Sequence, residues 1–148
     1  MLDESVQAIG IFNFSDWDYI EEVTLPSSIK CIEHAAFCGC KNLKRVNLSD
    51  GLEIIGADSF SGCESLKTII LPATLKKIYE YAFAGCGSVQ EIVIPSSVTS
   101  IGDAAFGDCD NLKAIYVPKK KVDYYKKRFP ADMHWLIVEE RADLPVKP

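Results

Sequence analysis

The sequence predicts a solenoid of the α/β class, in which coils of one short strand, a turn and a short helical return segment stack along one axis. Three observations support this prediction. Apolar residues and prolines recur with a period of 23 residues. Each unit contains a short alternation of apolar and polar residues, which is typical of a strand. The chain has 148 residues, 48% hydrophobic and 25% charged, a composition that excludes a disordered chain.

The period is visible in several independent columns of the sequence. The columns that keep the step of 23 are Ile32, Ile55, Ile78 and Ile101; Phe37, Phe60, Phe83 and Phe106; Cys40, Cys63, Cys86 and Cys109; and Leu43, Leu66, Val89 and Leu112. The units are a degenerate first repeat at 1–22, four full repeats over 23–114, and a C-terminal cap at 115–138. One unit cannot bury its apolar side alone, so the stacked units are expected to share one core.

Each unit is expected to contribute one strand to a parallel sheet. In the third unit, Ile69 and Leu71 are expected to point inward, and Thr68 and Ile70 outward, because side chains alternate along a strand. Pro72 then ends the strand, since proline has no N–H for a continuing ladder.

The return segment is predicted to be a short helix or 3-10 turn. Ile78, Ala82 and Phe83 share one helical face, because they are four and five residues apart. Gly85 and Gly87 follow directly and limit the segment to about two turns.

The repeat has a recognisable consensus. Residues 101–112 are the cleanest copy of the pattern I-x-x-x-A-F-x-x-C-x-x-L, which continues in the other units as x-x-[IV]-x-[IL]-P. This pattern resembles the BspA-like leucine-rich repeats, a 23-residue class found largely in bacterial surface proteins. The resemblance covers residues 23–118 strongly, and 1–22 and 119–137 weakly. It implies a right-handed leucine-rich-repeat solenoid with a concave parallel sheet, and commonly adhesion or recognition at a cell surface.

The cysteines are predicted to be packing residues. Those of the repeated column, such as Cys86, lie three residues after an inward phenylalanine and three before an inward leucine or valine. The alternative is a metal site or a cysteine-dependent enzyme built on Cys31, His34 and Cys38, since thiols and imidazoles bind zinc. Other repeats place unrelated residues in the Cys31 and His34 columns. We therefore expect no catalytic residue, no metal ligand and no cofactor.

The outward strand positions form the predicted protein-binding surface. Its residues are Arg45, Asn47, Thr68, Ile70, Glu91, Val93 and Tyr116. Because neighbouring strands lie about 4.8 Å apart, Ile70, Val93 and Tyr116 are expected to touch and to form an exposed apolar strip. Such a strip often marks a contact site. The alternative is that these residues simply favour strands.

Charge is sorted along the chain. Residues 1–22 carry six acids and no Lys or Arg, whereas residues 119–128 carry six bases and one acid. This predicts weak end-to-end self-association that depends on salt. Nucleic-acid binding is not expected, because no aromatic platform accompanies the bases. The alternatives are an acidic partner and a basic run that is simply a solvated cap. Val122, Tyr125 and Phe129 are predicted to form the buried face of a capping helix, followed by a strand at 135–138.

These features predict a single domain at 1–138 with a tail or linker at 139–148. The expected function is non-enzymatic protein recognition or adhesion, with a host or extracellular protein as the ligand. The alternative is a set of spacer repeats within a larger bacterial protein. The resemblance favours a surface or secreted location. Residues 1–4 lack the features of a signal peptide, which leaves the cytoplasm as the alternative. No membrane insertion is expected, because no apolar stretch approaches about 18 residues.

Overall fold

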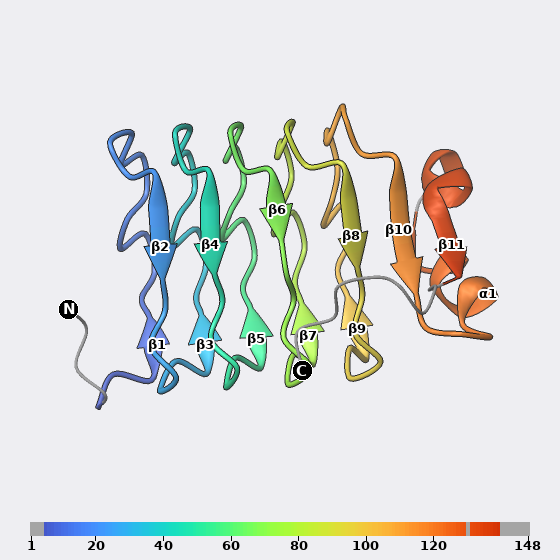
Figure 1. Ribbon diagram of the computed structural model, residues 1–148, viewed down its shortest axis with the longest axis horizontal. Coiled ribbons are helices and arrows are strands. Elements are labelled where there is room, and N and C mark those ends of the chain that lie inside the picture. Colours follow the sequence, from blue (N-terminus) through green and yellow to red (C-terminus); the bar gives the residue numbers. More distant parts are fainter. Residues whose placement is uncertain (1–4, 130, 140–148) are drawn as a thin grey trace.

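The computed structural model describes residues 5–129 and 131–139, which form six stacked coils. Each of the first five coils contributes a strand to two sheets, which we call front and back (Figure 1). The back sheet consists of β1 (Ala8–Ile9), β3 (Cys31–Ile32), β5 (Ile54–Ile55), β7 (Lys77–Ile78) and β9 (Ser100–Ile101). The front strands are β2 (Glu22–Thr24), β4 (Arg45–Asn47), β6 (Thr68–Ile69), β8 (Glu91–Val93), β10 (Ala114–Val117) and β11 (Ile137–Glu139). All pairings are parallel.

The strand register confirms the 23-residue period. Arg45 pairs with Glu22 on one side and with Thr68 on the other, so one coil equals one repeat. The last step is different, because Ile115 pairs with Ile137. The sixth coil is therefore one residue shorter than the others at this point.

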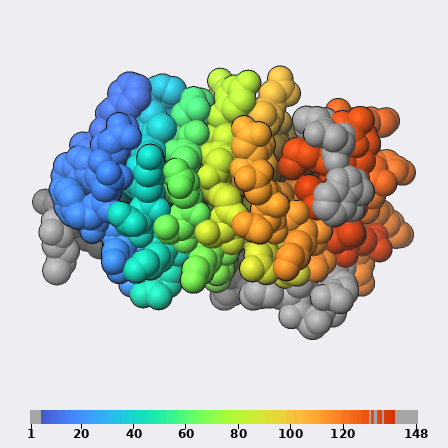
Figure 2. All heavy atoms as spheres, turned by 90° about the horizontal axis from the view of Figure 1, so that it is seen from above, coloured from blue at the N-terminus to red at the C-terminus, as the bar shows by residue number. Residues whose placement is uncertain are grey.

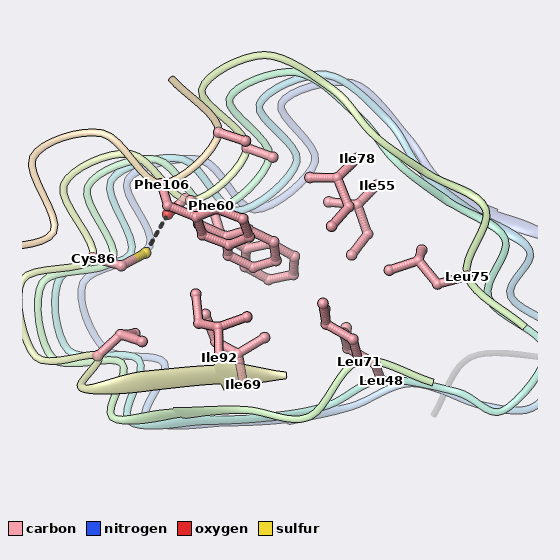
Figure 3. Packing of buried hydrophobic residues seen from close by; sticks show 14 of the residues in the cluster. Leu48, Ile55, Phe60, Ile69, Leu71, Leu75, Ile78, Cys86, Ile92 and Phe106 are labelled. Carbon is pink, nitrogen blue, oxygen red and sulfur yellow. Dashed lines mark hydrogen bonds between the residues drawn. The ribbon is translucent and has the colours of Figure 1, made fainter. Parts of the chain in front are cut away.

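A continuous stack of phenylalanine rings fills the core. The ring centroids of Phe60 and Phe83 lie 5.3 Å apart and those of Phe83 and Phe106 lie 5.5 Å apart, with nearly parallel planes. Figure 3 shows Phe60 and Phe106 nearly superimposed in a view along the stack, between front-sheet and back-sheet isoleucines. Phe14 and Phe129 extend the stack at its two ends. The ring spacing follows the strand spacing of about 4.8 Å.

The column cysteines pack beside the rings, as predicted. Cys40, Cys63 and Cys86 are fully buried, and all six cysteines are free thiols. Each column thiol donates a hydrogen bond to the carbonyl of a phenylalanine 26 residues earlier, for example Cys86 Sγ to Phe60 at 3.3 Å (Figure 3). A thiol is a small hydrophobic group and a weak hydrogen-bond donor, so it suits a buried position beside a backbone carbonyl.

The predicted helix over 78–83 is wrong. Ile78 belongs to β7, and a run of turns follows it. Alternate N–H groups in these segments bond to the next coil, as when Phe60 donates to Ala82 at 2.8 Å, and those between them bond three residues back, as when Ser61 donates to Asp58. Two residues per segment have a positive φ, in this coil Tyr81 at 55° and Gly85 at 70°. A helix cannot form because its internal hydrogen bonds are replaced by bonds between coils and its backbone twist is interrupted.

The helices of the described chain lie in the sixth coil. They are α1 (Val122–Lys126) and the 3-10 helix η1 (Ala131–Leu136). Val122 packs against the core and Tyr125 is buried, as predicted. Phe129 is also buried, but it lies beyond the end of α1, so the helix is shorter than predicted. The predicted strand at 135–138 begins later, at Ile137. Of the predicted tail, Glu139 belongs to β11 and residues 140–148 lie outside the described residues. Within the described part of the chain, no helix is long and apolar enough to cross a membrane.

Candidate protein-binding surface

The front sheet is interrupted between the third and fourth coils. Strands β2, β4 and β6 form one sheet and β8, β10 and β11 another, whereas the back sheet continues through the same coils (Figure 1). Beyond the paired strands, the N–H of Leu25 donates to Asn47 and that of Ile94 to Tyr116, at 3.0 and 2.8 Å. Within the described residues, the N–H of Leu71 makes no corresponding bond to Val93. We call this interruption the seam.

The seam lies where a side-chain bond between coils is missing. Asn42 Nδ2 donates to the carbonyl of Asp18 at 2.7 Å, and Asn111 donates in the same way to Gly87. The same column holds serine in the third and fourth coils. Serine at position 65 compensates through its backbone N–H, which donates to Lys41 at 3.1 Å, but Ser88 has no such bond to the third coil. The shorter serine side chain does not reach across, so the edge of the fourth coil is not tied to the third.

A hollow of about 720 Å³ opens over the seam. Its lining residues are Lys67, Thr68, Ile69, Ile70, Ser88, Gln90, Glu91, Val93 and Asn111. A second hollow of about 240 Å³ adjoins it over β4 and β6 and shares Thr68 and Ile70 with it. The second hollow is lined by Arg45, Val46, Asn47, Leu48, Thr68 and Ile70. Together they are called the front hollow, and six of the seven predicted residues line it, namely all except Tyr116.

The predicted apolar strip is shorter than expected. Ile70 is 39% exposed and Val93 is half-buried, but only 8% of Tyr116 is exposed. Tyr116 pairs with Val93 and with Val138 of β11, so its position lies inside the sheet between two neighbours. Its hydroxyl donates to Glu91 Oε1 at 3.4 Å. The accessible strip is therefore Ile70 with Val93, and Tyr116 supports its edge.

Charge pairing differs between the first coils and the front hollow. Glu22 Oε2 lies 2.7 Å from Arg45 Nη2, and this hydrogen bond and charge lower the pKa of Glu22. By contrast, neither Lys67 nor Glu91 forms an ion pair within the described residues. Besides the ion-paired Arg45, the hollow therefore offers Lys67 and Glu91 without an ion pair in the described chain, along with the amides of Gln90 and Asn111.

The structure does not assemble the alternative cysteine and histidine site. A His34 ring nitrogen, Nδ1, lies 3.1 Å from the carbonyl of Ala57. Burial raises the pKa of the thiols of Cys31 and Cys38, and nearby carboxylates add to this effect. A raised pKa favours the thiol over the nucleophilic thiolate. Among residues 5–129 and 131–139, no group of three or more His, Cys, Asp or Glu side chains is arranged to hold a metal ion.

The comparisons with known proteins agree with the repeat geometry. The model of the BspA type leucine rich repeat region matches six copies over residues 3–131. A crystal structure of a leucine-rich repeat protein of T. pallidum is similar with a TM-score of 0.74 and 38% identity, over 75% of this chain and 52% of that one. One from Bacteroides ovatus has a TM-score of 0.68 and 33% identity, over 76% and 37%.

A leucine rich cell surface protein from Faecalibacterium prausnitzii is similar with a TM-score of 0.64 and 33% identity, over 67% of this chain and 26% of that one. The chain thus spans about half or less of the length of these relatives. No curated protein matches the sequence significantly. The repeat register, the phenylalanine stack and the family match lead to one conclusion: the chain belongs to the BspA-type leucine-rich repeat family.

Proposed function

We propose that this chain is a protein-recognition module that binds an extended segment of a protein ligand in the front hollow. The main observation behind this proposal is that the front hollow lies over the seam and is lined by six of the seven residues of the predicted protein-binding surface. Leucine-rich repeats act as scaffolds whose surface residues, rather than the fold, set the activity.

The chemistry of the hollow suits a polypeptide. Thr68, Ser88, Gln90 and Asn111 offer hydrogen-bond donors and acceptors, and Ile70 offers an accessible apolar contact. The unpaired strand edges at the seam add backbone groups of the kind that pair with an extended chain. A mixed polar and apolar lining of this type is usual in non-obligate protein interfaces.

A surface or secreted location forms part of the proposal. It is supported by the relative from Faecalibacterium prausnitzii, which is described as a leucine rich cell surface protein. The ligand would then be a host or extracellular protein.

The test compares two double variants. Ile70→Glu with Val93→Glu places charge on the accessible strip, and Ile11→Glu with Tyr79→Glu does the same to exposed residues outside the hollow. The probe is a panel of purified extracellular host proteins, measured by biolayer interferometry against the unmodified chain. For any protein that binds, the front variant should weaken binding at least about tenfold, which corresponds to about 1.4 kcal/mol. The control variant should bind normally.

Circular dichroism and melting temperature establish that both variants are folded. A ligand that binds the front variant as tightly as the unmodified chain would contradict the proposed site. Binding by none of the panel at high concentration would favour the second candidate, spacer repeats within a longer protein. That candidate is supported by the relatives, of whose length this chain matches about half or less.

A further inference from the structure

The two ends of the solenoid carry opposite charge. The first coil contributes Asp16, Asp18, Glu21 and Glu22, and residues 5–24 contain no Lys or Arg. Lys119, Lys120, Lys121, Lys126, Lys127 and Arg128 surround α1 in the sixth coil. Figure 2 shows the coils as adjacent bands, with the first and sixth coils at opposite ends of the long axis. The charges are therefore separated along the axis on which the coils stack.

The acidic end also exposes apolar surface. Four of the eight exposed large hydrophobic residues in the described chain lie in the first coil, namely Ile11, Phe12, Trp17 and Tyr19. Trp17 occupies the column of the buried cysteines but is 40% exposed, and it stacks on Tyr19, which is 75% exposed. Asp16 and Asp18 flank Trp17 and form no ion pair within the described residues. An aromatic surface bordered by unpaired carboxylates fits a cationic partner.

The basic end has the complementary chemistry. Lys121, Lys127 and Arg128 are exposed, and the described chain offers none of them an ion-pair partner. The Arg128 guanidinium lies 3.6 Å from the centroid of the Tyr124 ring, and the Lys121 ammonium lies 5.1 Å from it. This end already holds its cations against an aromatic ring.

The strand edges at both ends are also open. In the described chain, β2 pairs only with β4, and β11 pairs only with β10. The paired strands within each sheet run in the same direction, so a second copy that continues the stack must place its first coil against the sixth coil of its neighbour. A contact between two first coils would instead bring like charges together. Both the topology and the charges favour a head-to-tail contact.

We infer that this chain associates head to tail with a second copy of itself, through the acidic aromatic surface of the first coil and the basic surface around α1. Such a contact uses different patches on the two molecules, so it leaves one patch of each kind free and can continue into longer assemblies. The contact is electrostatic and partly exposed, so it weakens as salt rises. It is independent of the front hollow.

The first test uses the unmodified chain. Sedimentation velocity over about 5 to 500 µM should show an average mass that rises with concentration at low salt. The rise should be largely abolished at about 1 M salt, where the Debye length falls to about 3 Å. A chain that stays monomeric over the whole range at low salt overturns the inference.

A charge-swap pair identifies the interface. The head variant carries Asp18→Lys and Tyr19→Lys, two exposed positions, and avoids Asp16 because its φ of 58° is left-handed. The tail variant carries Lys121→Glu and Lys127→Glu. Each variant alone should associate much more weakly than the unmodified chain, because its substituted residues face like charges on the opposite end of the next copy. An equimolar mixture should regain association, because an unmodified head can meet an unmodified tail and the substituted lysines can meet the substituted glutamates.

Association that is regained in the mixture requires that both variants are folded. Circular dichroism of each variant alone checks this. A tail variant that still associates alone would indicate pairing of two first coils, and would overturn the head-to-tail arrangement. A mixture of folded variants that stays monomeric would do the same. The Ile70→Glu and Val93→Glu variant should still self-associate, so failure of this inference is distinguishable from failure of the proposed function.

Discussion

Replacing Phe83 with alanine tests whether the phenylalanine stack supplies the stability of this fold. Phe83 is fully buried and contacts a ring on each side, at centroid distances of 5.3 and 5.5 Å. Truncating a buried phenylalanine costs about 3 to 5 kcal/mol, from the lost transfer free energy and the cavity. Two aromatic pairs, each worth about 0.5 to 1.5 kcal/mol, are lost together, so we expect a loss near the upper end of that range.

Equilibrium unfolding in urea, followed by far-UV circular dichroism, measures the change in the free energy of unfolding. Phe14→Ala is the matched comparison, because Phe14 is only partly buried and stacks on one phenylalanine, Phe37. It should cost less than Phe83→Ala. A loss below about 1 kcal/mol for Phe83→Ala, which is the ordinary effect of a point mutation, would refute the view that the stack is the core.

The remaining predictions concern the seam and the buried thiols. Ser88→Asn should supply the missing bond across the seam, stabilise the fold by about 0.5 to 1.5 kcal/mol, and slow amide exchange at Leu71. The control is Ser65→Asn, where the backbone already bonds to Lys41, and unchanged exchange at Leu71 would contradict this explanation of the seam. Burial raises the pKa of the Cys109 thiol from 9.0 to about 11 and raises those of Cys63 and Cys86 as well. The contribution of the buried thiols to the free energy of unfolding should therefore be fully present below pH 9 and should fall between pH 9 and 11. The reason is that thiols of the unfolded chain ionise at a lower pH than the same thiols in the folded protein. Urea midpoints at pH 8 and 10 measure this fall, which should shrink in Cys109→Ala, and an identical fall in that variant would disprove the role of this thiol.

The repeat itself explains why so much of the fold was predictable. Inward residues such as Ile69 and Leu71 are buried as expected, because alternation along a strand and a constant period leave one consistent way to stack the coils. Phe129 also lies 23 residues after Phe106 and completes the stack, so the same period could have identified it as a core residue.

The return segments were predicted wrongly for a physical reason. Apolar residues four and five apart, such as Ile78 and Phe83, suit a helix as a local pattern. In the stack, each coil lies next to backbone groups of the following coil, and bonds between coils satisfy alternate N–H groups. A single unit contains no information about that competition.

The coil length, the strand register and the buried columns follow from the residues alone, because each depends only on the 23-residue period. The sorting of charge also follows from the residues, because once the coils stack in order the acidic residues 1–22 and the basic residues 119–128 must lie at opposite ends. The tertiary structure alone decided where the front sheet opens and which outward residues remain accessible. The front sheet opens beside Ser88, whose side chain is too short to reach the preceding coil. Tyr116 is covered although its column faces outward. Both features depend on distances between coils, and those distances exist only once the coils are stacked.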